Sequence, residues 1–333
     1  MKYFLLGAFS SGFFLYGVAL VYGYSGSMDF GVINEAVVNN AGNQTLLDIG
    51  MGMLAVGLLF KVGAAPFQAW VPDVYQGAPT AVTAFMAAAT KVAAFGALLR
   101  LFYVAFGSAR WAWQPMMWVI AILTMIVGTV LALVQSDMKR MLAYSSVAHT
   151  GFLLTGVLGL QSAAALGPDQ LTSLQAVLFY LVTYGFTTLG AFAVVCLLLD
   201  SAGEQSTISR WAGLGKHSPV VAGVFSLFLL GMAGIPLTSG FTAKWAVFEV
   251  ALSAGAWPVV VVGILASAAA AFFYVRVIVV MYFHEPDSDS AYVAHPSVLT
   301  ATAIGVSAAA TIALGLIPGP VLDLAHNAGQ FIR

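Results

Sequence analysis

Three lysines of this sequence lie within long apolar stretches. Lys61 lies in 46–76, Lys91 lies near the middle of 79–107, and Lys244 lies in 219–252. A lysine at the bilayer centre costs about 3 kcal/mol on insertion scales and more than about 10 kcal/mol in simulations, so it is expected to face the interior of a helix bundle. Because burial disfavours the charged form of an amine, such a lysine can load and release a proton near neutral pH. The three lysines therefore indicate proton movement through a membrane.

A second interpretation of these lysines is structural. A lysine close to the end of a membrane helix can extend its amine to the membrane surface. Lys91 fits that interpretation poorly because it lies near the middle of its stretch. Lys61 fits it better if its own span is short.

Two other titratable residues are candidates for the same path. Glu249 follows Lys244 by five residues and either marks a proton exit or meets lipid headgroups. His149 lies in the middle of an apolar stretch and is either a proton relay or a hydrogen-bonded structural histidine. A polar stripe at helical spacing either joins two helices or lines a file of water molecules; it consists of Tyr180, Thr183, Tyr184, Thr187 and Thr188.

Two of the apolar stretches contain helix breakers. Pro66 follows Gly63, and Pro236 follows Gly234. A proline removes a backbone donor and ends or kinks a helix. Irregular backbone at membrane depth is tolerated only where protein or a wet cavity satisfies it, and transporters build ion sites beside such broken helices. Ion translocation is the working hypothesis.

The composition excludes several classes of protein. Of 333 residues, 61 % are hydrophobic and 8 % are charged, far from the roughly 25 % charged residues of soluble domains. The net charge of −1 argues against a nucleic-acid binder, which needs a basic face. Cys196 is the only cysteine, so the chain can form no internal disulfide and cannot ligate an iron–sulfur cluster, which takes about four ligands.

Hydropathy predicts an all-α polytopic membrane protein, because windows of ~19 apolar residues recur along the chain and strand-like alternation is absent. Lys2, Lys139 and Arg140 fall on one side of the predicted membrane, the cytoplasmic side by the positive-inside rule. We expect Asp137, Lys139 and Arg140 to form a solvated turn there. The nine predicted spans are 3–23, 46–76 (broken), 79–107, 114–135, 141–160, 174–199, 219–252 (broken), 257–283 and 297–317.

An internal repeat relates the two broken spans. Pro66 matches Pro236, and Arg100 matches Arg276, at offsets of 170 and 176 residues. Both arginines are expected to be interfacial anchors. Five helices fit between equivalent positions, an odd number, so the copies point in opposite directions, as in an inverted-topology repeat. We expect 1–107 to hold the last three helices of the first repeat, 108–284 the second five-helix repeat, and 285–333 a C-terminal helix and tail. Since the first repeat lacks its opening two helices, we expect the chain to begin inside a longer reading frame.

At several runs the sequence resembles a known family, the N subunits of the bacterial proton-pumping NADH–quinone oxidoreductase (complex I). The similarity extends along essentially the whole chain. Sister subunits L and M and cation/proton antiporter subunits share the general pattern but usually differ in the Pro-Asp-Val-Tyr…Gly-Ala-Pro run. The runs that carry the resemblance are 2–9 (KYFLLGAF), 66–80 (PFQAWVPDVYQGAPT), 139–146 (KRMLAYSS) and 234–237 (GIPL).

The resemblance implies a fold of fourteen helices with two inverted repeats, of which this chain would supply helices six to fourteen. Lys61 then matches the lysine of the first broken helix, Lys91 that of the next helix, and Lys244 that of the second broken helix; in the family these lysines form a proton path along the membrane midplane. The family's glutamate partner of the first lysine would precede this chain. Lys61 therefore lacks its counter-charge here, and a stand-alone fragment is not expected to pump. Gln68 also stands where a histidine is common, which removes one relay.

The implied function is that of an antiporter-like subunit in the bacterial inner (plasma) membrane, which moves protons without redox chemistry of its own. Quinone reduction elsewhere would shift the proton affinity of the lysine row. NADH, FMN, iron–sulfur clusters and quinone are expected in partner subunits, and the partners are other membrane subunits and the lipid bilayer. No G-x-G-x-x-G follows a strand, so nicotinamide binding is not predicted here. The alternative is a subunit of a multisubunit sodium/proton antiporter; a purely structural bundle is disfavoured by the lysines.

Overall fold

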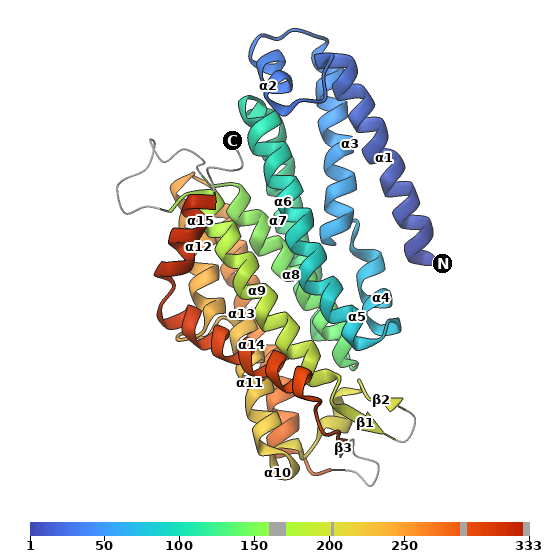
Figure 1. Cartoon of the computed structure of the whole chain (residues 1–333), viewed down its shortest axis with the longest axis vertical. Coiled ribbons are helices and arrows are strands. Elements are labelled where there is room, and N and C mark those ends of the chain that lie inside the picture. Colours follow the sequence, from blue (N-terminus) through green and yellow to red (C-terminus); the bar gives the residue numbers. More distant parts are fainter. Residues whose placement is uncertain (160–170, 201–202, 287–291, 329–333) are drawn as a thin grey trace.

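The computed structural model describes residues 1–159, 171–200, 203–286 and 292–328. Most helices run roughly parallel to the long axis of an elongated bundle (Figure 1). The helices are α1 (Lys2–Ser25), α2 (Phe30–Val38), α3 (Gln44–Val62), α4 (Val71–Gly77), α5 (Thr80–Phe85), α6 (Lys91–Arg100), α7 (Arg110–Leu133), α8 (Met138–Val157), α9 (Ser173–Val195), α10 (Leu214–His217), α11 (Pro219–Ala233), α12 (Ser239–Ser253), α13 (Trp257–Phe283), α14 (Val298–Leu316) and α15 (Gly319–Ala328).

Seven helices within the described residues are long and apolar enough to cross a membrane. The predicted span 141–160 corresponds to α8, which is more polar, and the predicted broken span 219–252 corresponds to α11 and α12 together. The seven helices are Lys2–Ser25, Gln44–Val62, Thr80–Ala105, Gly107–Leu133, Ser173–Val195, Trp257–Phe283 and Val298–Leu316.

Both predicted breaks interrupt a helix in the structure. Helix α3 ends at Val62 because Gly63 adopts a left-handed conformation with φ 73°, and α11 ends in the same way at Gly234, with φ 83°. A glycine in this conformation is the usual helix terminator. The chain resumes through a short 3-10 turn (Gln68–Trp70) and α4 after the first break, and through α12 after the second.

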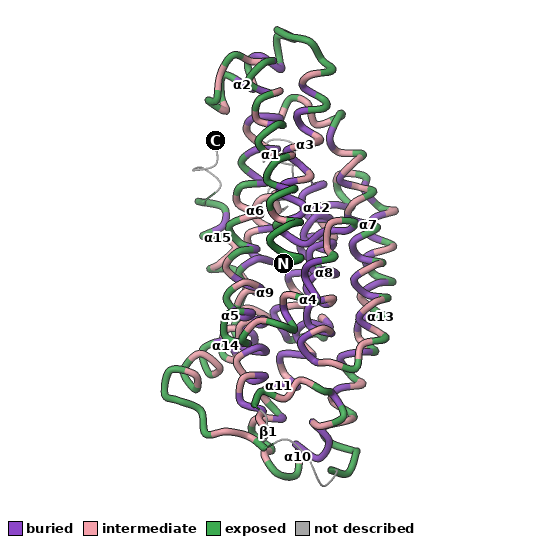
Figure 2. The backbone as a smooth tube through the Cα atoms, turned by 90° about the vertical axis from the view of Figure 1, so that its right-hand side faces the viewer, coloured by how far each residue is buried: buried purple, intermediate pink, exposed green. Residues whose placement is uncertain are grey.

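Helix α8 forms the centre of the bundle. All of its residues except Arg140 and Tyr144 are buried, and it contacts α7, α9, α12 and α13. The outer helix α1 buries only four residues, and Figure 2 shows it as mostly exposed next to the buried central helices. A lipid-facing helix needs no polar side chains on its outer face, so this exposure is that of a membrane protein.

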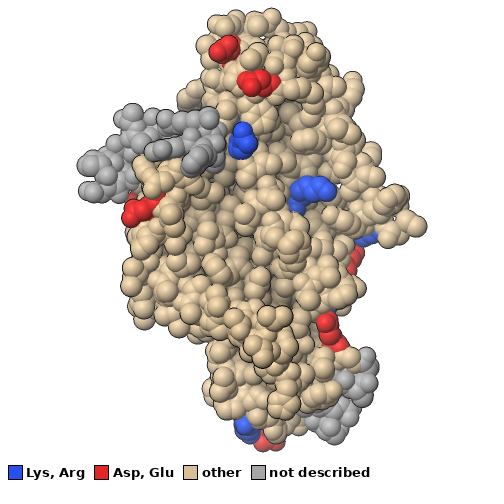
Figure 3. Space-filling model, viewed as in Figure 1, with Lys and Arg blue, Asp and Glu red and all other residues tan. Residues whose placement is uncertain are grey.

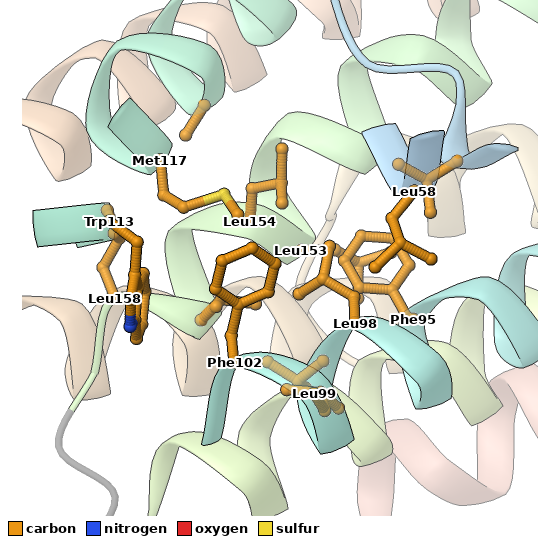
Figure 4. Packing of buried hydrophobic residues seen from close by; sticks show 14 of the residues in the cluster. Leu58, Phe95, Leu98, Leu99, Phe102, Trp113, Met117, Leu153, Leu154 and Leu158 are labelled. Carbon is orange, nitrogen blue, oxygen red and sulfur yellow. The ribbon is translucent and has the colours of Figure 1, made fainter. Parts of the chain in front are cut away.

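The apolar core lies where α3, α6, α7 and α8 meet (Figure 4). Trp113 is fully buried there and donates from Nε1 to the carbonyl of Phe106 at 3.0 Å, so the polar atom of the indole is satisfied. Side chains from all four helices interdigitate around it. The labelled members of this cluster are Leu58, Phe95, Leu98, Leu99, Phe102, Trp113, Met117, Leu153, Leu154 and Leu158.

A small antiparallel sheet, which the sequence analysis did not predict, lies at one end of the bundle (Figure 1). Its strands are β1 (Leu198–Asp200), β2 (Gly203–Glu204) and β3 (Tyr292–Val293), in the order β2-β1-β3. The predicted span 174–199 was therefore too long, because α9 ends at Val195 and the chain turns into β1. Three short strands leave too little alternation for a sequence pattern to detect.

Candidate functional site

Lys91 is buried in the middle of a continuous helical stretch. A π-helical segment, Met86–Thr90, directly precedes it, and such segments are frequent at functional sites. Its side chain is 3 % exposed. The amine Nζ donates to both the carbonyl and the hydroxyl of Ser146 at 2.7 Å and lies 4.7 Å from the ring centroid of Tyr184. No carboxylate within the described residues pairs with it.

Lys244 of α12 is bound by the C-terminal end of α11, the helix that precedes the second break. Its Nζ donates to the carbonyls of Met232 at 3.0 Å and Ala233 at 2.8 Å, and to the hydroxyl of Ser267 at 2.8 Å. These carbonyls belong to the last turn of α11, where a helix leaves its acceptors without internal partners and where its dipole favours a cation. All three amine donors are thus used by neutral oxygen atoms.

His149 lies between the two lysines on α8 and is 4 % exposed. Its Nδ1 lies 2.7 Å from the hydroxyl of Tyr180, and its Nε2 lies 3.3 Å from that of Tyr274. Tyr274 in turn bonds to Ser145. Both ring nitrogens therefore have hydroxyl partners, an arrangement compatible with a relay as well as with a structural role.

One face of α8 links the two lysines. Ser146, His149 and Phe152 follow one another at intervals of three residues, which places them on the same side of a helix. Ser146 accepts from Lys91 and from the hydroxyl of Tyr184 at 2.8 Å. At the other end, the ring centroid of Phe152 lies 4.9 Å from Nζ of Lys244. The fold brings Lys91, His149 and Lys244 into one buried row.

Lys61 and Glu249 lie outside this row. Lys61 is exposed in the last turn of α3, and no hydrogen bond or ion pair to it is recorded within the described residues. Glu249 is half-buried and lines, with Lys244 and Ser267, an apolar groove of about 500 Å³ between α12 and α13. The structure therefore assembles three of the five predicted residues and leaves two at its edges.

The polar stripe of α9 is buried and makes helix-to-helix contacts. Tyr180 and Tyr184 bond to side chains of α8, while Thr183 and Thr187 donate to carbonyls of their own helix. A cavity of about 10 Å³ also borders the stripe and His149, close to the smallest volume that holds one water molecule. The contacts support the joining role, and the cavity is too small for a file of water.

Ser145, Ser146, Ser267, Tyr274 and Phe152 are contact residues of this site that sequence reasoning did not assign to it. Ser146 and Phe152 carried a signal, because each lies three residues from His149 on one helix. Ser267 and Tyr274 carried none. They reach the site from α13, far along the chain, and only the tertiary fold brings them there.

The predicted solvated turn is wrong for Lys139. That side chain is buried, donates to the carbonyl of Ala78 at 2.7 Å and lies 3.5 Å from a carboxylate oxygen of Glu204 in β2. Arg140 beside it pairs with Asp73 at 2.8 Å. Hydrogen bonds from Lys2 and Arg140 lower the pKa of Asp73 below its usual range. The turn thus fastens α4, α5 and β2 to α8.

Arg276, expected at the membrane interface, caps the end of α7. Its guanidinium donates to the carbonyl of Leu133, the last residue of α7, at 2.8 Å and to that of Gln135, just after the helix, at 2.7 Å. Arg110 donates in the same way to the carbonyls of Leu158 and Gly159, directly after the end of α8. Figure 3 shows that the side of the molecule seen in Figure 1 is mostly uncharged, with a few isolated acidic and basic side chains. Charge is thus sparse on that surface, while these arginines cap helix ends.

The fold is that of an antiporter-like membrane protein. The family described as NADH:quinone oxidoreductase/Mrp antiporter, transmembrane, matches residues 1–270, and the chain belongs to this family. It is 70 % identical over its whole length to NADH-quinone oxidoreductase subunit N of Nocardioides sp., of which it covers 63 %. The seven apolar helices among the described residues, together with these relatives, make it a multi-pass protein of the bacterial inner membrane.

Two solved structures share the fold. A chain of respiratory complex I from Thermus thermophilus, determined with bound aureothin, matches with a TM-score of 0.81 and 36 % identity over 97 % of this chain and 67 % of that one. A chain of the Mrp complex from Dietzia sp. matches with a TM-score of 0.82 and 23 % identity, over 99 % and 67 %. The second likeness concerns the fold alone.

Proposed function

We propose that this chain is the proton-translocating part of subunit N of an NADH–quinone oxidoreductase. The support is the 70 % identity to a protein of that name together with a buried row of titratable side chains. Because the chain spans 63 % of that relative's length, the activity proposed is that of the full-length subunit within its complex. The row of Lys91, His149 and Lys244 is the single observation that carries the proposal.

The row is suited to holding protons in sequence. Lys91 and Lys244 donate only to neutral oxygen atoms, so no fixed counter-ion locks either amine in its charged form. The free energy of adding a proton to one amine then depends on the charges nearby, which act strongly in a medium of low dielectric constant. His149 lies between the amines with hydroxyls on both nitrogens and accepts a proton from one side while giving one to the other. Loading one member of the row lowers the proton affinity of the next.

Lys61 and Glu249 are proposed as the two ends of this path. Lys61 lies in the last turn before the first break, and Glu249 shares the groove of Lys244. Both are more exposed than the central row, as expected of residues that exchange protons with a neighbouring subunit or with solvent.

The rest of the reaction would belong to partner subunits. Other membrane subunits of complex I are the proposed partners, and NADH, FMN, iron–sulfur clusters and quinone would act there. Quinone reduction in those subunits would change the charge near one end of the lysine row. The proton is the transported ion, and this chain contributes its path.

The finer architecture is part of the same proposal: nine spans, with 1–107 ending one inverted repeat, 108–284 forming the second, and 285–333 following it. The support is the matched geometry of the breaks, where Gly63 and Gly234 both end a helix half in a left-handed conformation. A lysine of each broken span lies near its break, Lys61 before the first and Lys244 after the second. A subunit of a sodium/proton antiporter remains the second candidate, supported by a likeness of fold at 23 % identity and thus less well than complex I.

The test is to replace Lys91 or Lys244 by alanine in the full-length subunit and to measure protons pumped per NADH oxidised in membrane vesicles. Both variants should pump less, and NADH oxidation should fall as well if coupling is tight. Lys216 is exposed on α10, so Lys216→Ala is the matched control and should behave as the wild type. Full retention of pumping and oxidation by Lys91→Ala would remove Lys91 from the path.

A further inference from the structure

Hydrogen bonds divide the buried row into separate groups around Lys91, His149 and Lys244. On the Lys91 side, hydrogen bonds connect the amine to Ser146 and Ser146 to Tyr184. On the Lys244 side, hydrogen bonds connect the amine to α11 and to Ser267. His149 bonds to Tyr180 and Tyr274, and within the described residues no hydrogen bond joins this group to Lys91 or to Lys244. The ring of Phe152 contacts both His149 and Lys244.

Phe152 contacts both neighbours through its ring. The His149 and Phe152 ring centroids are 5.7 Å apart with an interplanar angle of 84°. On the other side, Nζ of Lys244 lies 4.9 Å from the same ring centroid. The ring is 1 % exposed and is braced edge-on by Phe248 of α12, at 6.0 Å. Phe152 therefore touches both residues of the step from His149 to Lys244 and brings only apolar atoms to it.

A phenyl ring cannot pass on a proton, because it offers neither a lone pair nor a transferable hydrogen. Apolar constrictions of this kind close pores by excluding water. The cavity between His149 and Met232, whose carbonyl accepts from Lys244, measures only about 10 Å³. It is at the limit for a single water molecule, so it is too small to hold a chain of water molecules from His149 toward Lys244.

The ring face also responds to the charge of Lys244. An ammonium group over an aromatic face is attracted to it, and the attraction is lost when the amine is neutral. A charged Lys244 therefore holds the ring of Phe152 in place, and a neutral Lys244 releases it. The barrier is firmest when Lys244 already carries its proton, which prevents that proton from returning to His149.

We propose that Phe152 is a gate in the proton path, an apolar barrier between His149 and Lys244 that the charge of Lys244 keeps closed. This inference rests on the proposed function. It adds a residue that does not titrate and whose task is to prevent leakage between two residues that do.

The experiment measures leakage directly. The full-length subunit carrying Phe152→Ala or Phe152→Leu is assembled into its complex and reconstituted into liposomes, and the decay of an imposed pH gradient is followed without NADH. Phe152→Ala should raise the decay rate several-fold, and Phe152→Leu should raise it less because leucine still fills part of the space. Phe102→Ala is the matched control, because Phe102 is equally buried but packs against Phe106 and Trp113; its decay rate should equal that of the wild type.

A double variant tests whether the leak caused by Phe152→Ala passes through Lys244. Phe152→Ala combined with Lys244→Ala should restore the slow decay, because the leak passes through the amine. A fast decay in the double variant, or equal rates for Phe152→Ala, Phe152→Leu and Phe102→Ala, would overturn the inference. The proposed function is tested apart from this by pumping in Lys244→Ala alone. If Lys244→Ala pumps normally, the proposed function is refuted. Normal gradient decay in both Phe152 variants refutes only the proposed role of Phe152.

Discussion

Lys91 and Ser146 are joined by two hydrogen bonds, since one amine donates to both the carbonyl and the hydroxyl of the same serine at 2.7 Å. The carbonyl of Ser146 belongs to the backbone of α8, so the Lys91 amine is hydrogen-bonded directly to the central helix of the bundle. The hydroxyl also accepts from Tyr184 of α9. Ser146 is therefore the point at which three helices share one polar contact.

Ser146→Ala should weaken proton pumping while the complex still assembles. The substitution removes one acceptor from Lys91 and leaves Tyr184 without its partner, and a hydrogen bond to a charged group is worth about 1.5–3 kcal/mol. Protons pumped per NADH oxidised in vesicles provide the measurement. Ser226→Ala serves as control, because Ser226 is also buried but donates only to a carbonyl of its own helix. Equal pumping by the two variants would contradict a role for Ser146.

Gly240→Ala should disrupt the second break severely. A Cβ atom at Gly240 would lie 1.8 Å from the carbonyl oxygen of Gly231, so the two helix halves would have to separate. Overpacking of this kind typically costs about 1–3 kcal/mol, and here the displaced atoms belong to the turn that holds Lys244. Thermal unfolding of the purified subunit in detergent measures the loss.

Gly52→Ala is the control for that measurement. Gly52 lies within α3 with no atom within 4 Å of the Cβ position, so the added methyl group meets no neighbour. Alanine should be tolerated there, and a melting temperature lowered as much as in Gly240→Ala would contradict the steric argument.

Arg276→Met should destabilise the end of α7. The methionine retains apolar bulk but leaves the carbonyls of Leu133 and Gln135 without their charged donor, and a hydrogen bond to a charged group is worth about 1.5–3 kcal/mol. A lowered melting temperature is expected. Arg100→Met provides the comparison, because Arg100 is exposed and lies over the ring of Phe30 at 5.7 Å. A larger loss at Arg100 than at Arg276 would contradict the capping role.

Asp73 should give the protein an acid-sensitive contact. Its pKa is lowered by hydrogen bonds from Lys2 and Arg140, so the folded state favours the carboxylate. The stabilisation is present above the unfolded pKa of about 3.9 and is lost as the pH falls through the lower folded value.

The variant Asp73→Asn tests that sign. Its melting temperature should be lower than that of the wild type at neutral pH, and the difference should shrink below about pH 4. The effect should be small, since the Asp73 side chain is 40 % exposed and solvent screens such pairs. A difference that grows on acidification would contradict the assignment.

The local sequence pattern predicted the helix breaks of this protein but not the contacts between distant residues. The breaks near Pro66 and Pro236 were predictable because glycine and proline act on the backbone at their own positions. The burial of Lys139 was not, because its partners Ala78 and Glu204 lie 61 and 65 residues away in the chain. The carbonyl partners of Arg276, 143 and 141 residues away in the chain, could not be predicted for the same reason.

The sequence by itself determined that the chain lies in a membrane, that two of its helices are broken, and that Lys91 and Lys244 have to be buried. These conclusions depend on composition, on local backbone chemistry and on the cost of a charge in hydrocarbon. Only the tertiary structure decided that α8 joins Lys91 to Lys244 through His149 and Phe152, while Lys61 and Glu249 stay at the edges. Such contacts depend on which helix faces pack together, and a single sequence does not show which distant residues pack against one another.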